Sequence, residues 1–592
     1  MSLRNGFGLV IPLTALILYL CFRIPGRLGD LASMAAVMSL FAMPLAGLWA
    51  SGQTQTTVLS GLIPLYDADA YYIDALRLIH GYDFSIVSAR RVLFPGLLAT
   101  LLSLTNHNLM ASLAILTGIV GIACYIAARE IQRTHGGEIS VFIVIIIFLF
   151  FRAHSGVSMT ENLGVALGVL GFTLLWQGAS IKNSVYVYSG VFVTTLALNA
   201  RAGAFFLLPI LILWAGWLLR KNDRISWRTA FYAACFVAAG FTLNILLTRL
   251  LAVPSGVPFA NFSYTLYGLA SGGKSWGYIY EAHPEIFSLD EPQQTMKIYQ
   301  VAFELIREKP LQAIQGALFN WRMLFSDSWY NIYAYVGGEN WILNVCARWT
   351  LYLLGLTGIY AWSRDRNDPI KSLIIASFFG VLISVPFLPP TDAYRMRPYA
   401  ASIIILAALP ALGLSFILKK LTKTIANTSI AAKVITPFSM SLTFTTILLF
   451  ISLTSPVILK INTTPIYLKP ASCKGNSDFV ITRFDEGTYI TVKRENQYFL
   501  DWMPNFHKGQ FEKNAHSLAD ANMIHWAESL QPPTIVFLSL DFHTNQKVLV
   551  ALASETIPTP GRYYQFCGES SEPLSSTQYA VFYTNEVLPL SP

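Results

Sequence analysis

The sequence predicts a polytopic α-helical membrane protein that ends in a small α/β domain. Of its 592 residues, 54% are apolar and only 12% are charged, whereas soluble domains have roughly 25% charged residues. After residue 460, polar turns and short β-prone runs replace the long apolar stretches. We therefore expect a membrane domain, residues 1–460, and an exoplasmic α/β domain, residues 461–592.

Twelve stretches of the membrane domain are apolar over roughly 20 residues, the length that spans the hydrocarbon core of a bilayer. They are residues 7–22, 31–50, 109–128, 139–151, 162–180, 184–200, 203–219, 228–250, 342–362, 370–388, 398–418 and 434–459. The apolar segment 92–105 has about 14 residues, contains Pro95 and runs straight into the next stretch. We expect that segment to lie in the membrane interface.

Basic residues in the short loops predict the orientation, because positively charged loops resist translocation. If all twelve stretches cross, the clusters around Arg129, Arg220 and Lys419 lie on one side, which is then cytoplasmic. The exoplasmic side has the loops 51–91 and 251–341 and the C-terminal domain. Aromatic residues are frequent in the loop 251–341, where their rings suit either sugar stacking or the headgroup belt.

The C-terminal domain alternates β-prone runs with turns and has one helix-like stretch, residues 515–529. Its β-prone runs are residues 479–483, 489–492 and 535–540. An oxidising compartment favours a disulfide between Cys473 and Cys567, the alternative being two buried thiols. The domain has 9 Lys and Arg residues against 13 Asp and Glu residues, so the net charge of +8 comes from the membrane domain. We expect that charge to orient the protein in the membrane and to attract anionic lipid, and we expect no nucleic-acid partner.

An acidic pair, Asp67 and Asp69, follows the second apolar stretch in the run YDADAYY, residues 66–72. An unpaired carboxylate near hydrocarbon costs several kcal/mol, so the pair indicates chemistry at the bilayer face. Residues two apart in an extended loop point the same way, so both carboxylates could address one site. The alternative is that one of them caps a helix that begins near Ala70.

Arginine side chains suit bidentate binding of phosphate, and several lie where the predicted exoplasmic surface begins. Arg201, Arg395 and Arg397 lie at exoplasmic helix ends, against the positive-inside trend, with snorkelling to the interface as the alternative. Arg90 and Arg91 begin the interfacial segment and suit either donor phosphate or lipid headgroups.

The remaining candidates for substrate contact are Glu161, His80, Tyr71 and Tyr394. Glu161 ends the run SMTE, which also has the pattern of a helix capping box. The nine histidines show no close pairs at metal-ligand spacing, so no zinc site is expected.

The order of these motifs resembles the GT-C superfamily of membrane glycosyltransferases, in particular its protein mannosyltransferase and aminoarabinose transferase branches. The motifs are Asp67-Ala68-Asp69 in the first loop, LFPGLLA at 93–99, Ala-Arg at 128–129, MTEN at 159–162, NARAG at 199–203 and YRMRP at 394–398. The resemblance extends over the membrane domain and depends on the order of the motifs.

The resemblance implies an inverting transferase that moves a sugar from a polyprenyl-phosphate-linked donor to a glycan, lipid or protein acceptor. It favours Asp69 as general base, with Asp67 orienting the acceptor or helping to bind a divalent cation, Mg²⁺ or Mn²⁺; no cofactor is required. Phosphate is a good leaving group, so such a site needs a base for the acceptor and cations for the phosphate. The early loop and the tail resemble bacterial members, so we expect the inner membrane with the C-terminal domain in the periplasm, the alternative being the endoplasmic reticulum.

Three other functions are compatible with parts of the sequence. A ligase or polymerase of lipid-linked glycan shares the donor type and the side of the membrane. A flippase or transporter also needs many spans, yet it more naturally shows broken helices at mid-membrane and internal repeats. A scaffold that binds partners through its tail needs fewer spans than twelve.

Overall fold

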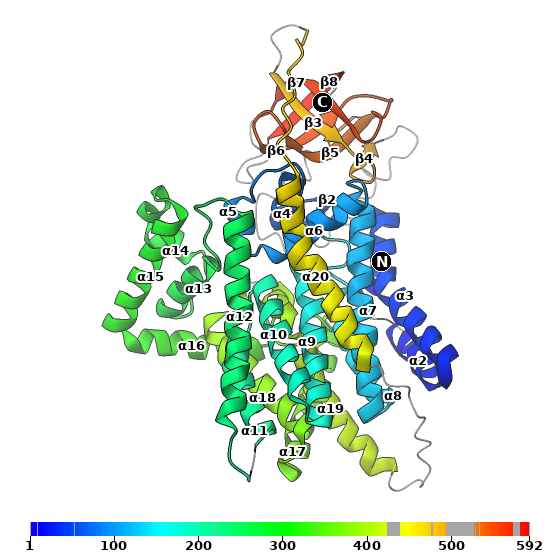
Figure 1. Ribbon diagram of the computed structural model, residues 1–592, viewed down its shortest axis with the longest axis vertical. Helices are drawn as coiled ribbons and strands as arrows, with labels where there is room; N and C mark the ends of the chain where they lie inside the picture. The colour runs from blue at the N-terminus through cyan, green and yellow to red at the C-terminus, as the bar shows by residue number, and fades with distance from the viewer. Residues whose placement is uncertain are drawn as a thin grey trace.

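The computed structural model shows a bundle of long helices with a β-sheet domain seated on one end (Figure 1). We call this end of the bundle the sheet end. The structure describes the chain except residues 423–437, 475–477, 493–525, 527–528, 532, 572–579 and 591–592 and the single positions 1, 7, 9, 53, 221, 339 and 393.

Each of the twelve predicted stretches overlaps a helix of the bundle. These helices are α2 (Val10–Arg23), α3 (Gly26–Ser51), α7 (Leu109–His135), α8 (Gly137–Phe151), α9 (Glu161–Ile181), α10 (Ser184–Ala200), α11 (Leu207–Leu218), α12 (Trp227–Leu251), α17 (Trp341–Arg364), α18 (Pro369–Ser384), α19 (Ile403–Thr422) and α20 (Phe438–Asn462). Within the described residues, eight helices are long and apolar enough to cross a membrane, whereas α2, α8, α10 and α11 are shorter apolar helices. The protein is therefore an integral membrane protein, and the count of twelve crossings stays a prediction.

Shorter elements connect the bundle helices. They are α1 (Ser2–Asn5), β1 (Val58–Leu59), β2 (Ile63–Pro64), α4 (Asp67–Ile79), α5 (Ile86–Ala89), α6 (Leu93–Leu104), α13 (Asn261–Ala270), α14 (Tyr278–Ala282), η1 (Pro284–Ser288), α15 (Glu291–Glu308), α16 (Pro310–Phe325), η2 (Val385–Phe387), η3 (Pro390–Asp392) and η4 (Tyr394–Ser402). Helix α6 is the segment predicted to lie in the interface. It has 12 residues and packs against α4 and α20 under the sheet domain (Figure 1). Helices α13 to α16 form a separate group beside α12 (Figure 1).

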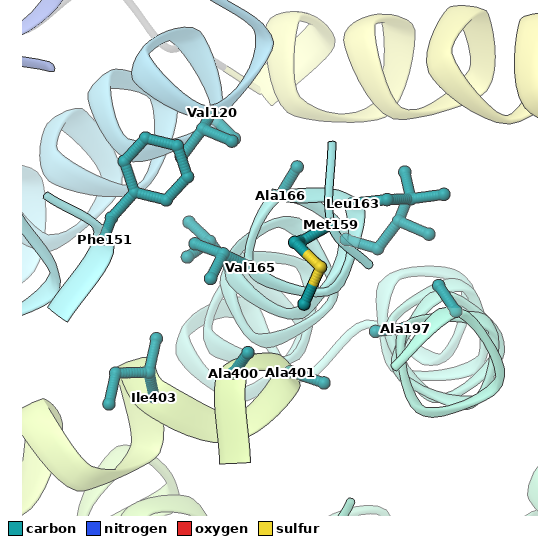
Figure 2. Close-up of a cluster of buried hydrophobic side chains, with 14 of the residues drawn as sticks. Val120, Phe151, Met159, Leu163, Val165, Ala166, Ala197, Ala400, Ala401 and Ile403 are labelled. Carbon is teal, nitrogen blue, oxygen red and sulfur yellow. The ribbon is translucent and has the colours of Figure 1, made fainter. Parts of the chain in front are cut away.

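Helix α9 lies at the centre of the bundle and is buried along nearly its whole length. Two of its glycines permit unusually close packing. A Cβ at Gly168 would lie 2.0 Å from the carbonyl oxygen of Ala401, and one at Gly164 would lie 2.6 Å from the Cβ of Arg201. Figure 2 shows this region, where alanines of α10 and η4 face α9. Small residues let helix backbones approach closely, and here they bring Arg201 and η4 to the first turn of α9.

The C-terminal domain contains a six-stranded sheet in the described residues. Its strands are β3 (Asp478–Phe484), β4 (Tyr489–Val492), β5 (Thr534–Asp541), β6 (Gln546–Leu552), β7 (Arg562–Ser570) and β8 (Val581–Leu590). Their order is β3-β7-β8-β6-β5-β4, with antiparallel neighbours except for the parallel pair β6 and β8. The three predicted β-prone runs lie in β3, β4 and β5. Most of the helix-like stretch 515–529 lies outside the described residues.

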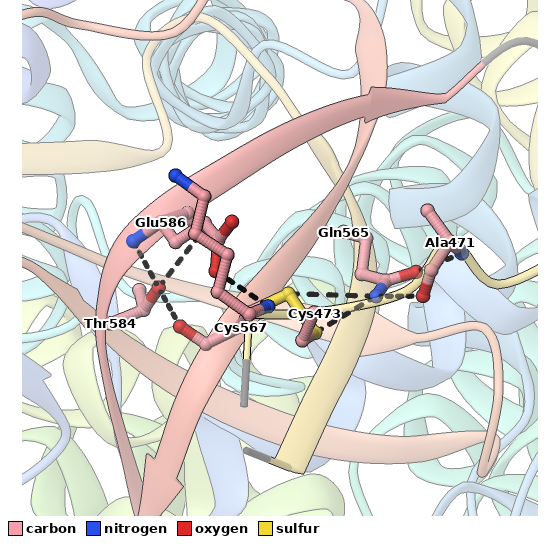
Figure 3. Close-up of a disulfide and its surroundings, with 7 residues drawn as sticks. Ala471, Cys473, Gln565, Cys567, Thr584 and Glu586 are labelled. Carbon is pink, nitrogen blue, oxygen red and sulfur yellow. Dashed lines mark hydrogen bonds between the residues drawn. A yellow bond between two sulfur atoms is a disulfide. The ribbon is translucent and has the colours of Figure 1, made fainter. Parts of the chain in front are cut away.

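A disulfide between Cys473 and Cys567 ties the segment that enters the sheet domain to β7 (Figure 3). Beside it, the side chain of Gln565 donates a hydrogen bond to the carbonyl oxygen of Ala471 at 2.8 Å and accepts one from its backbone N–H at 2.7 Å. The chain that leaves α20 is therefore fixed to the sheet both covalently and by hydrogen bonds.

Candidate functional site

A cavity of about 890 Å³ lies between α4, α11, α12 and the α13–α16 group. Part of its lining is strongly charged, and we call this part the charged end. Its groups are the guanidinium groups of Arg90, Arg91, Arg201 and Arg397 and the carboxylate of Asp67. Much of the remaining lining is apolar and includes Ile212 of α11 and Val237 and Phe241 of α12. The cavity therefore combines an anion-attracting end with a wall made by apolar helices of the bundle.

Asp67 is the first residue of α4, and its carboxylate extends into the cavity. Its Oδ2 lies 2.8 Å from Nη2 of Arg397, and its side chain, which lines the cavity, is 54% exposed. Partial desolvation within the cavity raises the pKa of Asp67, but the charge and hydrogen bond of Arg397, together with the charge of Arg91, more than offset this, so the pKa lies below its ordinary value. Asp67 is therefore ionised at neutral pH.

Left-handed backbone precedes both members of this ion pair. Tyr66, before Asp67, has φ of 55°, and Arg395 and Met396, before Arg397, have φ of 51° and 62°. Such conformations in non-glycine residues cost of order 1 kcal/mol each and cluster at functional sites. The strain lies where the chain turns to bring the two side chains together.

Glu161, the first residue of α9, is fully buried behind Arg397. Its Oε1 accepts a hydrogen bond from Nε of Arg397 and lies 3.4 Å from Nη2 of Arg201. The N-cap residue of α9 makes no side-chain cap hydrogen bond, so the capping-box alternative for Glu161 is wrong. Instead, the carboxylate contacts the guanidinium groups of two arginines from distant segments of the chain. A buried carboxylate is strongly stabilised by such partners.

Arg90 and Arg91 lie on the other side of the charged end. Nε of Arg90 donates to Oε1 of Glu291, at the start of α15, at 2.7 Å. Nη1 of Arg91 donates to the hydroxyl of Tyr71, which also lines the cavity, at 3.3 Å. Four guanidinium groups thus face the cavity with one carboxylate among them, while Glu161 and Glu291 lie behind. This lining favours an anionic ligand.

Asp69 and His80 face the sheet domain and are not among the residues that line the cavity. The expectation of an extended loop is wrong, because α4 begins at Asp67 and residues two apart on a helix project from nearly opposite faces. The capping alternative is wrong as well, since the N-cap position is Tyr66 and makes no side-chain cap hydrogen bond. Oδ2 of Asp69, a residue only 1% exposed, lies 3.2 Å from Nζ of Lys547 on β6.

Burial is the main cause of two pKa shifts on this side of α4. It raises the pKa of Asp69 to about 7, with Lys547 acting in the opposite direction. Burial also lowers the pKa of His80 to about 3, with the neighbouring His107 adding to the effect. The ring of His80 packs edge-on against that of Phe542, with the ring centres 4.6 Å apart. His80 is therefore neutral and joins α4 to the sheet domain by packing.

The YRMRP motif divides between the cavity and its surroundings. Arg397 lines the cavity, whereas the guanidinium of Arg395 lies 5.0 Å from the ring centre of Trp329. The structure describes the backbone of Tyr394, which begins η4. Across the described ranges, no group of three or more His, Cys, Asp or Glu residues is placed to hold a metal ion.

Sequence reasoning missed Glu291 and Lys547, the partners of Arg90 and Asp69. They are 201 and 478 residues away from those partners, and no local pattern marks either of them. The aromatic residues of the loop 251–341 do mark part of the site in the sequence, because Phe259, Phe262 and Trp276 line the cavity.

Together the fold and the site define a polytopic membrane protein with a charged cavity beside apolar helices. No protein-family model matches the chain, and no curated protein matches it significantly. Among solved structures, it is similar to the oligosaccharyltransferase of Archaeoglobus fulgidus in complex with zinc and sulfate, with a TM-score of 0.39 and 12% identity over 84% of this chain and 57% of that one. A complex of the archaeal enzyme with an inhibitory peptide and dolichol-phosphate gives a TM-score of 0.38 and 12% identity over 84% and 60%. The chain thus spans less than two thirds of the length of these structures.

Proposed function

We propose that this protein is a membrane glycosyltransferase that moves a sugar from a polyprenyl-phosphate-linked donor to an exoplasmic glycan, lipid or protein acceptor. The cavity is the observation that supports this proposal. It joins four guanidinium groups and an ionised carboxylate to a wall formed by apolar helices. A ligand that satisfies both ends has an anionic head and a long apolar tail.

The donor is expected to lie with its prenyl chain along α11 and α12. Ile212, Val237 and Phe241 give that chain an apolar lining. Its phosphate then lies among the guanidinium groups, which bind phosphate oxygens in pairs. Arg91 and Arg201 are the phosphate ligands that we propose, because both line the cavity and their side chains contact Tyr71 and Glu161, respectively.

The reaction that we propose is a single displacement at the anomeric carbon. Asp67 takes the proton of the acceptor hydroxyl, the acceptor oxygen bonds to the anomeric carbon, and the bond from that carbon to the phosphate oxygen breaks. The electron pair of the broken bond goes to the phosphate, where the guanidinium groups stabilise the charge. Such a displacement inverts the anomeric centre. Family resemblance favours Asp69 as the base, but the cavity lining supports Asp67.

Arg397 links the base to the leaving group in this proposal. Its Nη2 lies 2.8 Å from Oδ2 of Asp67. A phosphate that draws this guanidinium toward itself weakens that ion pair and raises the basicity of Asp67. Donor binding would therefore activate the base.

A panel of radiolabelled polyprenyl-phosphate sugars, offered to the protein in liposomes, tests the proposal. We expect the wild type to transfer one of them, and Arg91→Gln to lower transfer by roughly tenfold or more through loss of a charge-assisted hydrogen bond. Arg562→Gln is the matched control, because Arg562 is exposed on the sheet domain. Equal transfer by wild type and Arg91→Gln would contradict the phosphate assignment, and no transfer from any donor would contradict the substrate class.

A further inference from the structure

We infer that Lys547 of the sheet domain is a positioning residue, which clamps the first turn of α4 through Asp69 and thereby fixes the carboxylate of Asp67 in the cavity. The effect on sugar transfer rests on the proposed function. The clamp itself does not, because it is a contact between two domains of the described structure.

The first observation is the ion pair that crosses the domain boundary. Both oxygens of the Asp69 carboxylate lie near Nζ of Lys547, at 3.3 and 3.2 Å. Asp69 is buried, and the Lys547 side chain is 33% exposed. A buried carboxylate is strongly unfavourable without a cation. Because Asp67 and Asp69 share the first turn of one helix, a shift of Asp69 moves Asp67 with it.

The second observation is that the same β-hairpin also holds the last turn of α4. Nη2 of Arg77 donates to the carbonyl oxygen of Asn545 at 2.8 Å, and its Nη1 is paired with Asp74 at 2.7 Å. Asn545 lies in the turn between β5 and β6, two residues before Lys547. The hairpin therefore holds α4 at both ends, and this fixes the direction of the helix axis.

The third observation is that the sheet domain has an independent anchor on the membrane domain. Arg483 of β3 contacts the ring of His107 and donates to the side chain of Asn106 at 3.1 Å. Asp485 lies 3.4 Å from Nδ1 of His107. These contacts reach the turn between α6 and α7, so the hairpin acts on α4 from a domain that is already fixed.

Hydrogen exchange of the protein in nanodiscs at pH 8 tests the clamp without any substrate. We expect Lys547→Met to speed exchange of the amides in residues 67–79 by roughly tenfold, and Lys547→Arg to restore the wild-type rate. Lys469→Met is the matched control, since Lys469 is an exposed lysine of the same domain, and it is expected to change nothing. Unchanged exchange in Lys547→Met would overturn the clamp.

Transfer kinetics then separate positioning from direct catalysis. We expect Lys547→Met to lower kcat by roughly tenfold with the donor KM unchanged, and the pair Asp69→Asn with Lys547→Met to fall no further than either single variant. Additive losses would overturn the positioning role and leave Asp69 with a function of its own. If the wild type transfers no sugar, the proposed function fails, whereas the exchange experiment still decides whether the clamp exists.

Discussion

Replacement of Arg397 by methionine should destabilise the fold by about 3 kcal/mol. The guanidinium of Arg397 joins the carboxylates of Asp67 and Glu161. Removal of one partner from a buried ion pair costs roughly 3 to 5 kcal/mol, because the other charge is left uncompensated. Glu161 is 0% exposed, but Arg201 remains 3.4 Å away and the Arg397 side chain is itself 24% exposed. These two facts place the expected cost at the lower end of the range.

A double-mutant cycle isolates the pair from other effects of the substitution. Glu161→Gln keeps the shape of the buried side chain without its charge, so Arg397→Met should cost far less in that background. We expect a coupling free energy of about 2 kcal/mol, measured by equilibrium unfolding in mixed micelles. Additivity of the two single effects to within about 0.5 kcal/mol would refute the reasoning, because it would mean that Arg397 contributes no charge compensation to Glu161.

Three further predictions follow from single features. The pKa of Asp69 is raised to about 7 from an ordinary value of 3.8, so its contribution to stability is complete below pH 4 and is lost as pH rises through 7; Asp69→Asn should remove this fall, and an unchanged pH profile would contradict it. Reduction of the Cys473–Cys567 disulfide, which closes a separation of 94 residues, should destabilise the sheet domain by about 4 kcal/mol, measured by urea unfolding with and without reductant; equal midpoints would be inconsistent with this. Gly168→Val places side-chain atoms against η4, where even a Cβ would lie 2.0 Å from a carbonyl oxygen, and should lower the thermal midpoint markedly, with Gly8→Val as the unhindered control.

The helices of the bundle and several strands are predictable because their signals are local. An apolar run of the length of α7 or α12 can hardly be anything but a buried or spanning helix. The β-prone runs of the sheet domain are likewise marked by their own residues, although their order in the sheet is not.

The site was less predictable because its contacts join distant segments. Glu161 has the local pattern of a capping box, yet its carboxylate forms ion pairs with two arginines far along the chain. Asp67 and Asp69 look equivalent in the sequence. They differ because α4 begins at Asp67, which turns one carboxylate to the cavity and the other to Lys547. Sequence patterns therefore indicate which residue types form the site. Which groups those residues contact depends on the packing of α4, η4 and the sheet domain.

The most direct test of the account is sugar transfer by Asp67→Asn, compared with Asp69→Asn at matched expression and folding. We predict that Asp67→Asn lowers kcat by roughly a hundredfold or more through loss of the general base, with little change in donor KM, and that Asp69→Asn retains clearly more activity. Full activity of Asp67→Asn, or a larger loss in Asp69→Asn, would contradict the assignment of the base to the carboxylate that faces the cavity.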